Sequence, residues 1–234
     1  MTEDRFKPKR SRGMTRLETF TDAAFAFAVA LLAISIDEIP GNYAELVTAL
    51  KGAPAFLASF ALLLLYWRAH QNWSDRYALE DLPSVLLTAA LICLVMIYVY
   101  PLKIMFLGAF AAITGGWLPY DFEMRSFREF RMLVTIYGVG WIGLNLLIAA
   151  LYVHAWSRRE ALGMAPEERF DTVAEAVAWL IVGSFGAMSI ALAWTLPEPH
   201  VALAGWLYCG LAAFGPCYDW LTRRMSRQRF GEPQ

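Results

Sequence analysis

Six long apolar segments constrain the fold of this chain more than any other feature of its sequence. A helix needs about 20 mostly apolar residues to cross a bilayer. The composition fits such helices, because 58% of the residues are hydrophobic and 18% are charged, against about 25% charged in an average soluble domain. The sequence therefore predicts an all-α integral membrane protein with six transmembrane helices. They cover residues 17–37, 53–73, 82–106, 131–153, 173–195 and 201–221.

The connections between these segments differ in length and polarity. Residues 42–52 are amphipathic and predict a short helix at the membrane surface, and Pro101 is expected to close the third span. The fifth and sixth spans are joined by only LPEPH, which predicts an antiparallel hairpin. We expect loops over residues 107–130 and 157–172. The predicted organisation is a basic cytoplasmic tail (1–15), a six-helix transmembrane channel domain (16–222) and a second basic tail (223–234).

The distribution of Lys and Arg predicts the orientation. Cytoplasmic loops carry an excess of basic residues, and an even number of spans puts 15 of the 20 Lys and Arg residues on the side that holds both termini. The chain is therefore expected to be a multi-pass protein of the cell membrane, embedded in the lipid bilayer, with both termini in the cytoplasm. The basic tail serves this orientation, so we expect no nucleic-acid partner.

Several function classes find little support in the residues. The three cysteines have no metal-ligand spacing, and we expect neither a metal nor a cofactor. The acidic cluster Glu167, Glu168 and Asp171 is typical of a solvated helix start, and no catalytic constellation is visible, so we expect no enzyme. A secondary transporter stays open as an alternative, although the chain lacks the internal repeat that many transporters show.

The first apolar segment combines a charged entry with a patterned apolar helix. Its sequence is RLETFTDAAFAFAVALLAISI from Arg16 onward, and ionisable groups at this depth need partners within the protein. At about 100° per residue, Phe27, Leu31 and Ile34 fall within roughly 60° of one another and form an apolar stripe. Asp22 lies roughly 140° from Phe27 by the same arithmetic, and is expected to point into its own subunit. By itself such a stripe could face lipid or pack in the core.

Two motifs resemble a known family. Arg16, Phe20, Thr21 and Asp22 match the R-x-x-x-F-S-D signature of the transmembrane-protein-175 family, the endolysosomal potassium/proton channel and its prokaryotic relatives, with Thr at the usual Ser. The second segment contains Trp67 and His70, and their spacing is similar to the family's W-x-x-H element.

The resemblance implies a cation channel in which the first helix of each subunit lines a central pore. One copy of the motif per chain cannot enclose a pore, so we expect a homotetramer. The family's apolar constriction corresponds to Phe27, Leu31 and Ile34. Ala30 stands where family members often place Thr, and this leaves open whether potassium, sodium or protons pass. The resemblance favours a potassium-permeable channel, with a proton-permeable channel as an alternative.

The resemblance also implies a polar network at the cytoplasmic end. Trp67 and His70 are expected to form hydrogen bonds with Arg16, Thr21 and Asp22, with Arg16 balancing the charge of Asp22. Phe20 belongs to the same motif. His70 could serve as a proton sensor, because its ordinary pKa is about 6.5, or as a neutral hydrogen-bonding side chain.

Overall fold

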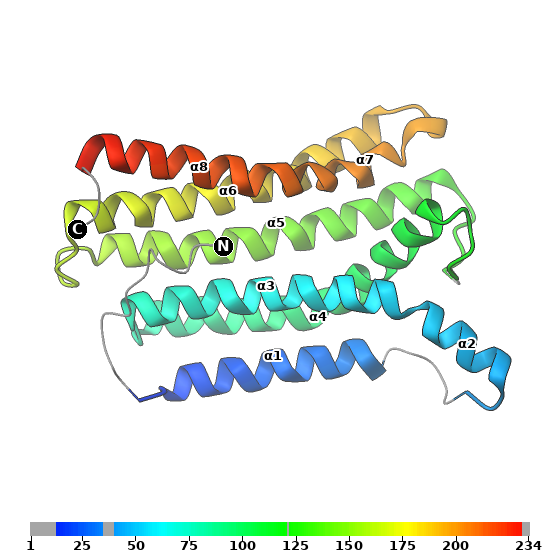
Figure 1. The fold of residues 1–234 in the computed structure, drawn as a ribbon, viewed down its shortest axis with the longest axis horizontal. Coiled ribbons are helices and arrows are strands. Elements are labelled where there is room, and N and C mark those ends of the chain that lie inside the picture. The colour runs from blue at the N-terminus through cyan, green and yellow to red at the C-terminus, as the bar shows by residue number, and fades with distance from the viewer. Residues whose placement is uncertain (1–12, 35–39, 121, 231–234) are drawn as a thin grey trace.

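The computed structural model is a bundle of long helices that run side by side (Figure 1). It describes residues 13–34, 40–120 and 122–230, and within these ranges all regular structure is helical. Among the described residues, five stretches are long and apolar enough to cross a membrane. They are α1 (Arg16–Ile34), α2 (Tyr43–Lys51) continuing into α3 (Ala53–Tyr77), α4 (Leu82–Ile113), α5 (Phe127–Ser157) and α6 (Pro166–Thr195). The all-helical membrane architecture predicted from the sequence is thus confirmed.

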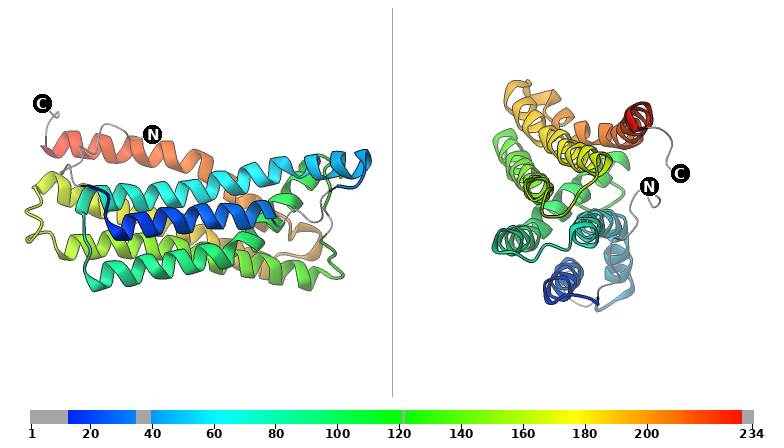
Figure 2. Two further views of the ribbon diagram at one scale, coloured as in Figure 1. Left: turned by 90° about the horizontal axis from the view of Figure 1, so that it is seen from below. Right: turned by 90° about the vertical axis from the view of Figure 1, so that its left-hand side faces the viewer.

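The sixth predicted span is not one continuous helix. Residues 201–221 divide into α7 (Leu203–Trp206), the 3-10 turn η2 (Leu207–Gly210) and the first half of α8 (Leu211–Phe230). A short 3-10 turn, η1 (Glu198–His200), precedes them. α8 lies alongside α6, as expected of an antiparallel hairpin (Figures 1 and 2). Because α8 continues to Phe230, the boundary expected at residue 222 falls inside a helix.

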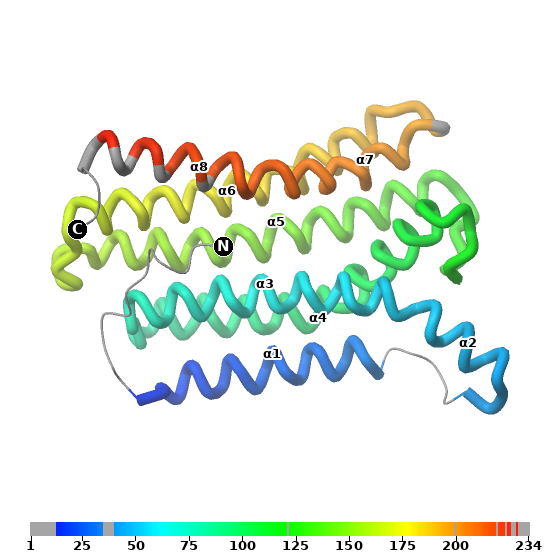
Figure 3. The backbone as a smooth tube through the Cα atoms, viewed as in Figure 1, coloured from blue at the N-terminus to red at the C-terminus, as the bar shows by residue number. Residues whose placement is uncertain are grey.

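α4 is longer than the sequence predicts. Pro101 was expected to end the third span, but the helix continues through it to Ile113, so the following loop is shorter than residues 107–130. Proline in a helix interior removes one hydrogen bond and bends the axis, and neighbouring helices can stabilise the bent form. The second half of α4 accordingly turns away from α3 (Figures 1 and 3).

The core lies between α3, α4, α5 and α6, and α1 covers it from one margin of the bundle (Figure 2). α5 and α6 approach closely because glycines meet at their crossing. A Cβ on Gly186 would lie 2.9 Å from the Gly138 carbonyl oxygen, which leaves no room for a side chain. Large buried aromatic residues, among them Tyr66, Trp73 and Tyr152, fill the remaining space.

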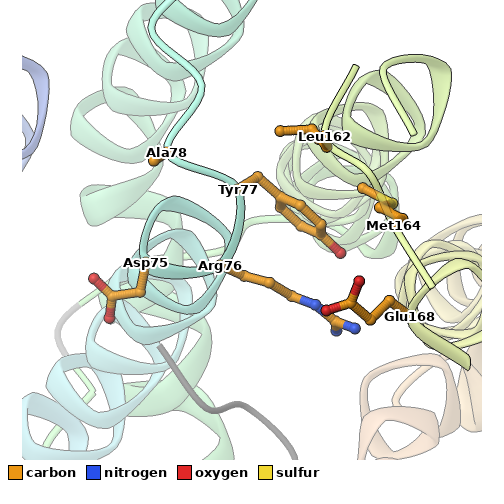
Figure 4. A pocket seen from close by; sticks show the side chains of 7 residues that line it. All are labelled: Asp75, Arg76, Tyr77, Ala78, Leu162, Met164 and Glu168. Carbon is orange, nitrogen blue, oxygen red and sulfur yellow. The ribbon is translucent and has the colours of Figure 1, made fainter. Parts of the chain in front are cut away.

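One end of the bundle carries a small pocket between α3 and α6 (Figure 4). It has a volume of about 40 Å³ and is lined by Arg76, Tyr77 and Glu168, among others. Next to it, Arg76 Nη2 lies 3.8 Å from Asp171 Oδ2, with both side chains about nine-tenths buried. The helix start predicted around Glu167 is present, but Asp171 is buried against Arg76 rather than solvated. The sequence prediction was wrong here because the partner comes from a distant helix.

At the same end, the turn between α3 and α4 is tied to the end of α5. His154 Nε2 lies 3.0 and 2.9 Å from the two carboxylate oxygens of Asp81, and Arg158 Nη2 donates to Oδ2 at 3.0 Å. Asp81 also caps α4 by accepting from the Ser84 backbone N–H at 3.3 Å. Burial raises the pKa of Asp81, but hydrogen bonds from Ser84 and His154 outweigh this effect and lower it to about 2.

We expect this contact to make the stability of the protein depend on pH in the acidic range. Folding lowers the Asp81 pKa from 3.8 to about 2. The carboxylate therefore contributes fully to the free energy of unfolding above about pH 4, and this contribution is lost as the pH falls through about 2. Thermal unfolding in detergent between pH 4 and pH 2 should show a smaller loss of stability in Asp81→Asn, which keeps a capping oxygen, than in the parent. Glu160→Gln is the matched control, since Glu160 is exposed. Equal pH dependence in the parent and Asp81→Asn would contradict this assignment.

Candidate functional site

α1 has one packed face and one exposed face. Its buried residues, Thr21, Ala24, Phe25, Ala28 and Leu32, lie against α3 and α4. The opposite side is exposed over the whole helix, and we call it the bare face of α1. Its large residues are Phe20, Phe27 and Ile34, which are 60%, 54% and 73% exposed. Four alanines complete it: Ala23, Ala26, Ala30 and Ala33.

The three residues of the predicted apolar stripe do not have equal surroundings. Phe27 and Ile34 lie on the bare face, and so does Ala30. Leu31 is half-buried and packs against the core cluster, so it lies at the edge of the bare face. The helical wheel predicts a single stripe because it carries no information about how far α3 and α4 extend around α1.

Asp22 points away from the bare face and into its own subunit, as the wheel predicts. The indole N–H of Trp67, on α3, donates to Asp22 Oδ1 at 2.8 Å. Both side chains are half-buried. A hydrogen bond to a carboxylate is among the stronger ones in proteins, so it fixes the rotation of α1 relative to α3 and thereby the direction of the bare face.

Glu18 forms a second connection between α1 and α3 that the sequence analysis missed. Its Oε2 accepts from the Thr15 backbone N–H at 2.8 Å, and its Oε1 accepts from the Ser74 hydroxyl at 2.9 Å. The hydroxyl oxygen of Thr15 in turn accepts from the Glu18 backbone N–H at 3.2 Å. The spacing T-x-x-E is a recognised helix-start signal, and it could have identified Glu18 as a structural residue.

Arg16 does not balance the charge of Asp22 within the subunit. Its side chain is exposed, and among the described residues no ion pair joins it to Asp22. The two residues are six positions apart, which places them roughly 120° from each other around the helix. Arg16 and Phe20 therefore lie on the exposed side, whereas Asp22 faces α3.

His70 and Thr21 also have partners other than those expected. His70 is buried, and its Nε2 lies 3.0 Å from the Thr88 hydroxyl of α4. Its ring also rests against Trp73, with the ring centroids 5.7 Å apart. The Thr21 hydroxyl donates to the Leu17 carbonyl, 2.8 Å away in the same helix. Trp67–Asp22 and Glu18–Ser74 thus connect α1 to α3, and His70–Thr88 connects α3 to α4.

Comparisons with known proteins agree on one family. The family model described as endosomal/lysosomal potassium channel TMEM175 matches residues 16–101. A potassium channel of Marivirga tractuosa is 29% identical over 231 residues, which cover 94% of this chain and 92% of that relative. A crystal structure of a variant of the potassium channel MtTMEM175, in complex with a nanobody–MBP fusion protein, is similar with a TM-score of 0.79 and 27% identity. That similarity covers 96% of this chain and 98% of the other.

Proposed function

We propose that the chain is a member of the TMEM175 family and a potassium-permeable cation channel of the cell membrane. The bare face of α1 is the observation that supports this function most directly. A membrane helix that exposes a complete face in the isolated subunit, with its two carboxylates, Glu18 and Asp22, turned toward α3, is suited to line a pore or contact another copy. The relatives it resembles over nearly its full length are channels rather than enzymes.

The channel we propose is a homotetramer with α1 of each subunit around the central axis. Most soluble homo-oligomers have closed rotational symmetry. In a ring of four subunits with this symmetry, the same face of every subunit, here the bare face of α1, is turned toward the central axis. The alanines of the bare face support close approach of neighbouring helices, because small residues let membrane helices pack tightly. Mass measurement of the purified complex should give four subunits.

Phe27, Leu31 and Ile34 form the apolar constriction in this proposal. Phe27 and Ile34 would face the axis, with Leu31 beside them at the edge of the bare face. A narrow apolar ring opposes ion passage because it expels the water that surrounds an ion. Ala30, on the same face, offers a methyl group where a hydroxyl could contact a partly dehydrated cation. We therefore propose that potassium permeates with limited discrimination against sodium.

The polar contacts at the beginning of α1 hold this pore helix in place in our proposal, without direct contact to permeating ions. Trp67–Asp22 is the central contact, and Glu18–Ser74 supports it. Thr21 and His70 stabilise the same end through their separate partners, the Leu17 carbonyl and the Thr88 hydroxyl, whereas Arg16 and Phe20 lie on the exposed side. The orientation with both termini in the cytoplasm is supported by the position of Arg76, Arg158 and Arg169 at the end of the bundle where α1 begins (Figure 1).

Current measurement in planar bilayers tests the proposed function. With potassium on one side and sodium on the other, we expect discrete single-channel steps and a reversal potential displaced toward that of potassium. A pH gradient across the same bilayer would shift the reversal potential if protons permeate. Flux that requires a second, coupled ion and shows no unitary steps would instead indicate a secondary transporter and would refute the channel proposal.

A further inference from the structure

A large apolar cavity lies in the half of the bundle opposite the polar contacts of α1. Its volume is about 410 Å³, within the range of small-molecule binding sites. Its walls are the second half of α4, the first half of α5 and the α7–η2 segment, and Leu62 of α3 and Tyr120 and Met124 of the α4–α5 connection also line it. The bend of α4 beyond Pro101 and the break of the last helix at η2 separate these walls, so the cavity follows from two irregularities of the bundle.

The chemistry of the walls selects an apolar occupant. Ile104, Met105, Phe106, Leu133 and Trp141 face the cavity from α4 and α5. A buried water needs two to four polar partners. The side chains of the walls offer few: the hydroxyls of Tyr120, Tyr137 and Tyr208, since the Trp141 indole N–H already donates to the Val182 carbonyl. An unfilled space of this size would also leave the wall atoms without dispersion contacts on one side.

The opening of the cavity is on the outside of the subunit. Ala202, Trp206 and Cys209 line it and are exposed, so the cavity can be reached from the surface between α4 and α7. The long walls of the cavity are formed by α4 and α5, which are both apolar enough to cross a membrane, and only the short α7–η2 wall is not part of such a helix. A face at this level that no other subunit covers therefore meets lipid. Trp206 at the opening is of the residue type that is enriched where hydrocarbon meets the headgroups.

We propose that this cavity binds an aliphatic chain of a membrane phospholipid. The chain would enter between α4 and α7 and extend inward past Met105 toward Leu62, filling the space left by the bend of α4. The bound chain would fix the distance between α4 and α7. This site is separate from the bare face of α1 and its occupancy does not depend on ion conduction.

Gly205 offers a way to fill the cavity from within. It lies on α7 and lines the cavity, and a Cβ at this position would meet only the Met105 Cε atom, at 3.9 Å. The first atom of a larger side chain is therefore accommodated without contact with backbone, and the rest of that side chain is expected to occupy the cavity. Gly215 on α8 is the matched control, since a Cβ there has nothing within 4 Å and Gly215 does not line the cavity.

Native mass spectrometry of the purified protein with added phosphatidylglycerol tests the proposal. We expect the parent and Gly215→Phe to retain at least one phospholipid per subunit after detergent removal, and Gly205→Phe to lose most of it, at least fivefold. If Gly205→Phe does not fold, Ala109→Leu on the opposite wall should reduce retention in the same direction. Equal retention in all variants would overturn the proposal. Retention of detergent in place of phospholipid would also overturn it. Dissociation of the oligomer by Gly205→Phe would overturn it as well, because this result would indicate that another subunit fills the cavity.

Discussion

Phe27→Ala should raise the single-channel conductance of the protein several-fold, the largest functional effect that we expect. In the proposed tetramer, four phenyl rings at one level of the central pore would leave a narrow, dry opening, and a dry apolar ring would set the barrier to ion passage. Removing the rings widens the opening and admits water. A reduction of the barrier by about 1.4 kcal/mol corresponds to a tenfold higher rate. The measurement is conductance in planar bilayers at fixed potassium concentration.

Phe27→Asn separates hydration from size, because the amide retains water in a narrow opening. It should also raise the conductance. Leu31→Ala should act in the same direction but more weakly, since Leu31 is half-buried at the edge of the bare face. Leu57→Ala is the matched control, because Leu57 is 60% exposed on α3 and lies outside the proposed pore. If both Phe27 variants conduct no better than the parent, the bare face of α1 does not line the permeation path.

The helices themselves were predictable because apolar length and periodicity determine them. The first five spans correspond to helices of the structure, and the wheel of α1 correctly turns Asp22 away from Phe27. Irregular features were not predictable in the same way. Whether Pro101 ends α4 or bends it depends on the neighbours that stabilise the second half of the helix, and a single segment carries no such information.

Hydrogen-bond partners were predictable only where a family motif or a local pattern specifies them. The Trp67–Asp22 contact agrees with the resemblance, and the capping pattern of Thr15 and Glu18 is visible in the sequence. The bond between His70 and Thr88 joins helices whose relative rotation comes from packing, so no sequence pattern indicates it. The same holds for Arg76 and Asp171, which are far apart in the chain and close in space.

Loss of the Trp67–Asp22 hydrogen bond should cost more stability than any other single polar change at the α1–α3 contact. The bond is 2.8 Å long, half-buried and joins a neutral donor to a carboxylate. A hydrogen bond to a charged group contributes about 1.5–3 kcal/mol, and leaving the indole N–H without an acceptor adds its desolvation cost. We expect Asp22→Leu to lower the thermal unfolding midpoint by several degrees and to reduce the yield of assembled protein.

Conservative variants distinguish the effect of losing the hydrogen bond from the effect of changing the side-chain volume. Asp22→Asn keeps an oxygen that can accept from Trp67 and should have the smaller effect, whereas Trp67→Phe removes the donor and should resemble Asp22→Leu. The double variant Asp22→Leu/Trp67→Phe should lose less stability than the sum of the two single losses, because no donor is then left unpaired.

The matched control is Trp194→Phe. Trp194 Nε1 donates to the Thr135 hydroxyl at 3.0 Å, but at an exposed position where water can replace the bond. Its loss should change the unfolding midpoint little. A well-assembled Asp22→Leu protein with an unchanged midpoint and an altered ratio of potassium to sodium permeability would place Asp22 in the ion path. The Trp67–Asp22 hydrogen bond would then not be the contact that fixes the orientation of the bare face of α1.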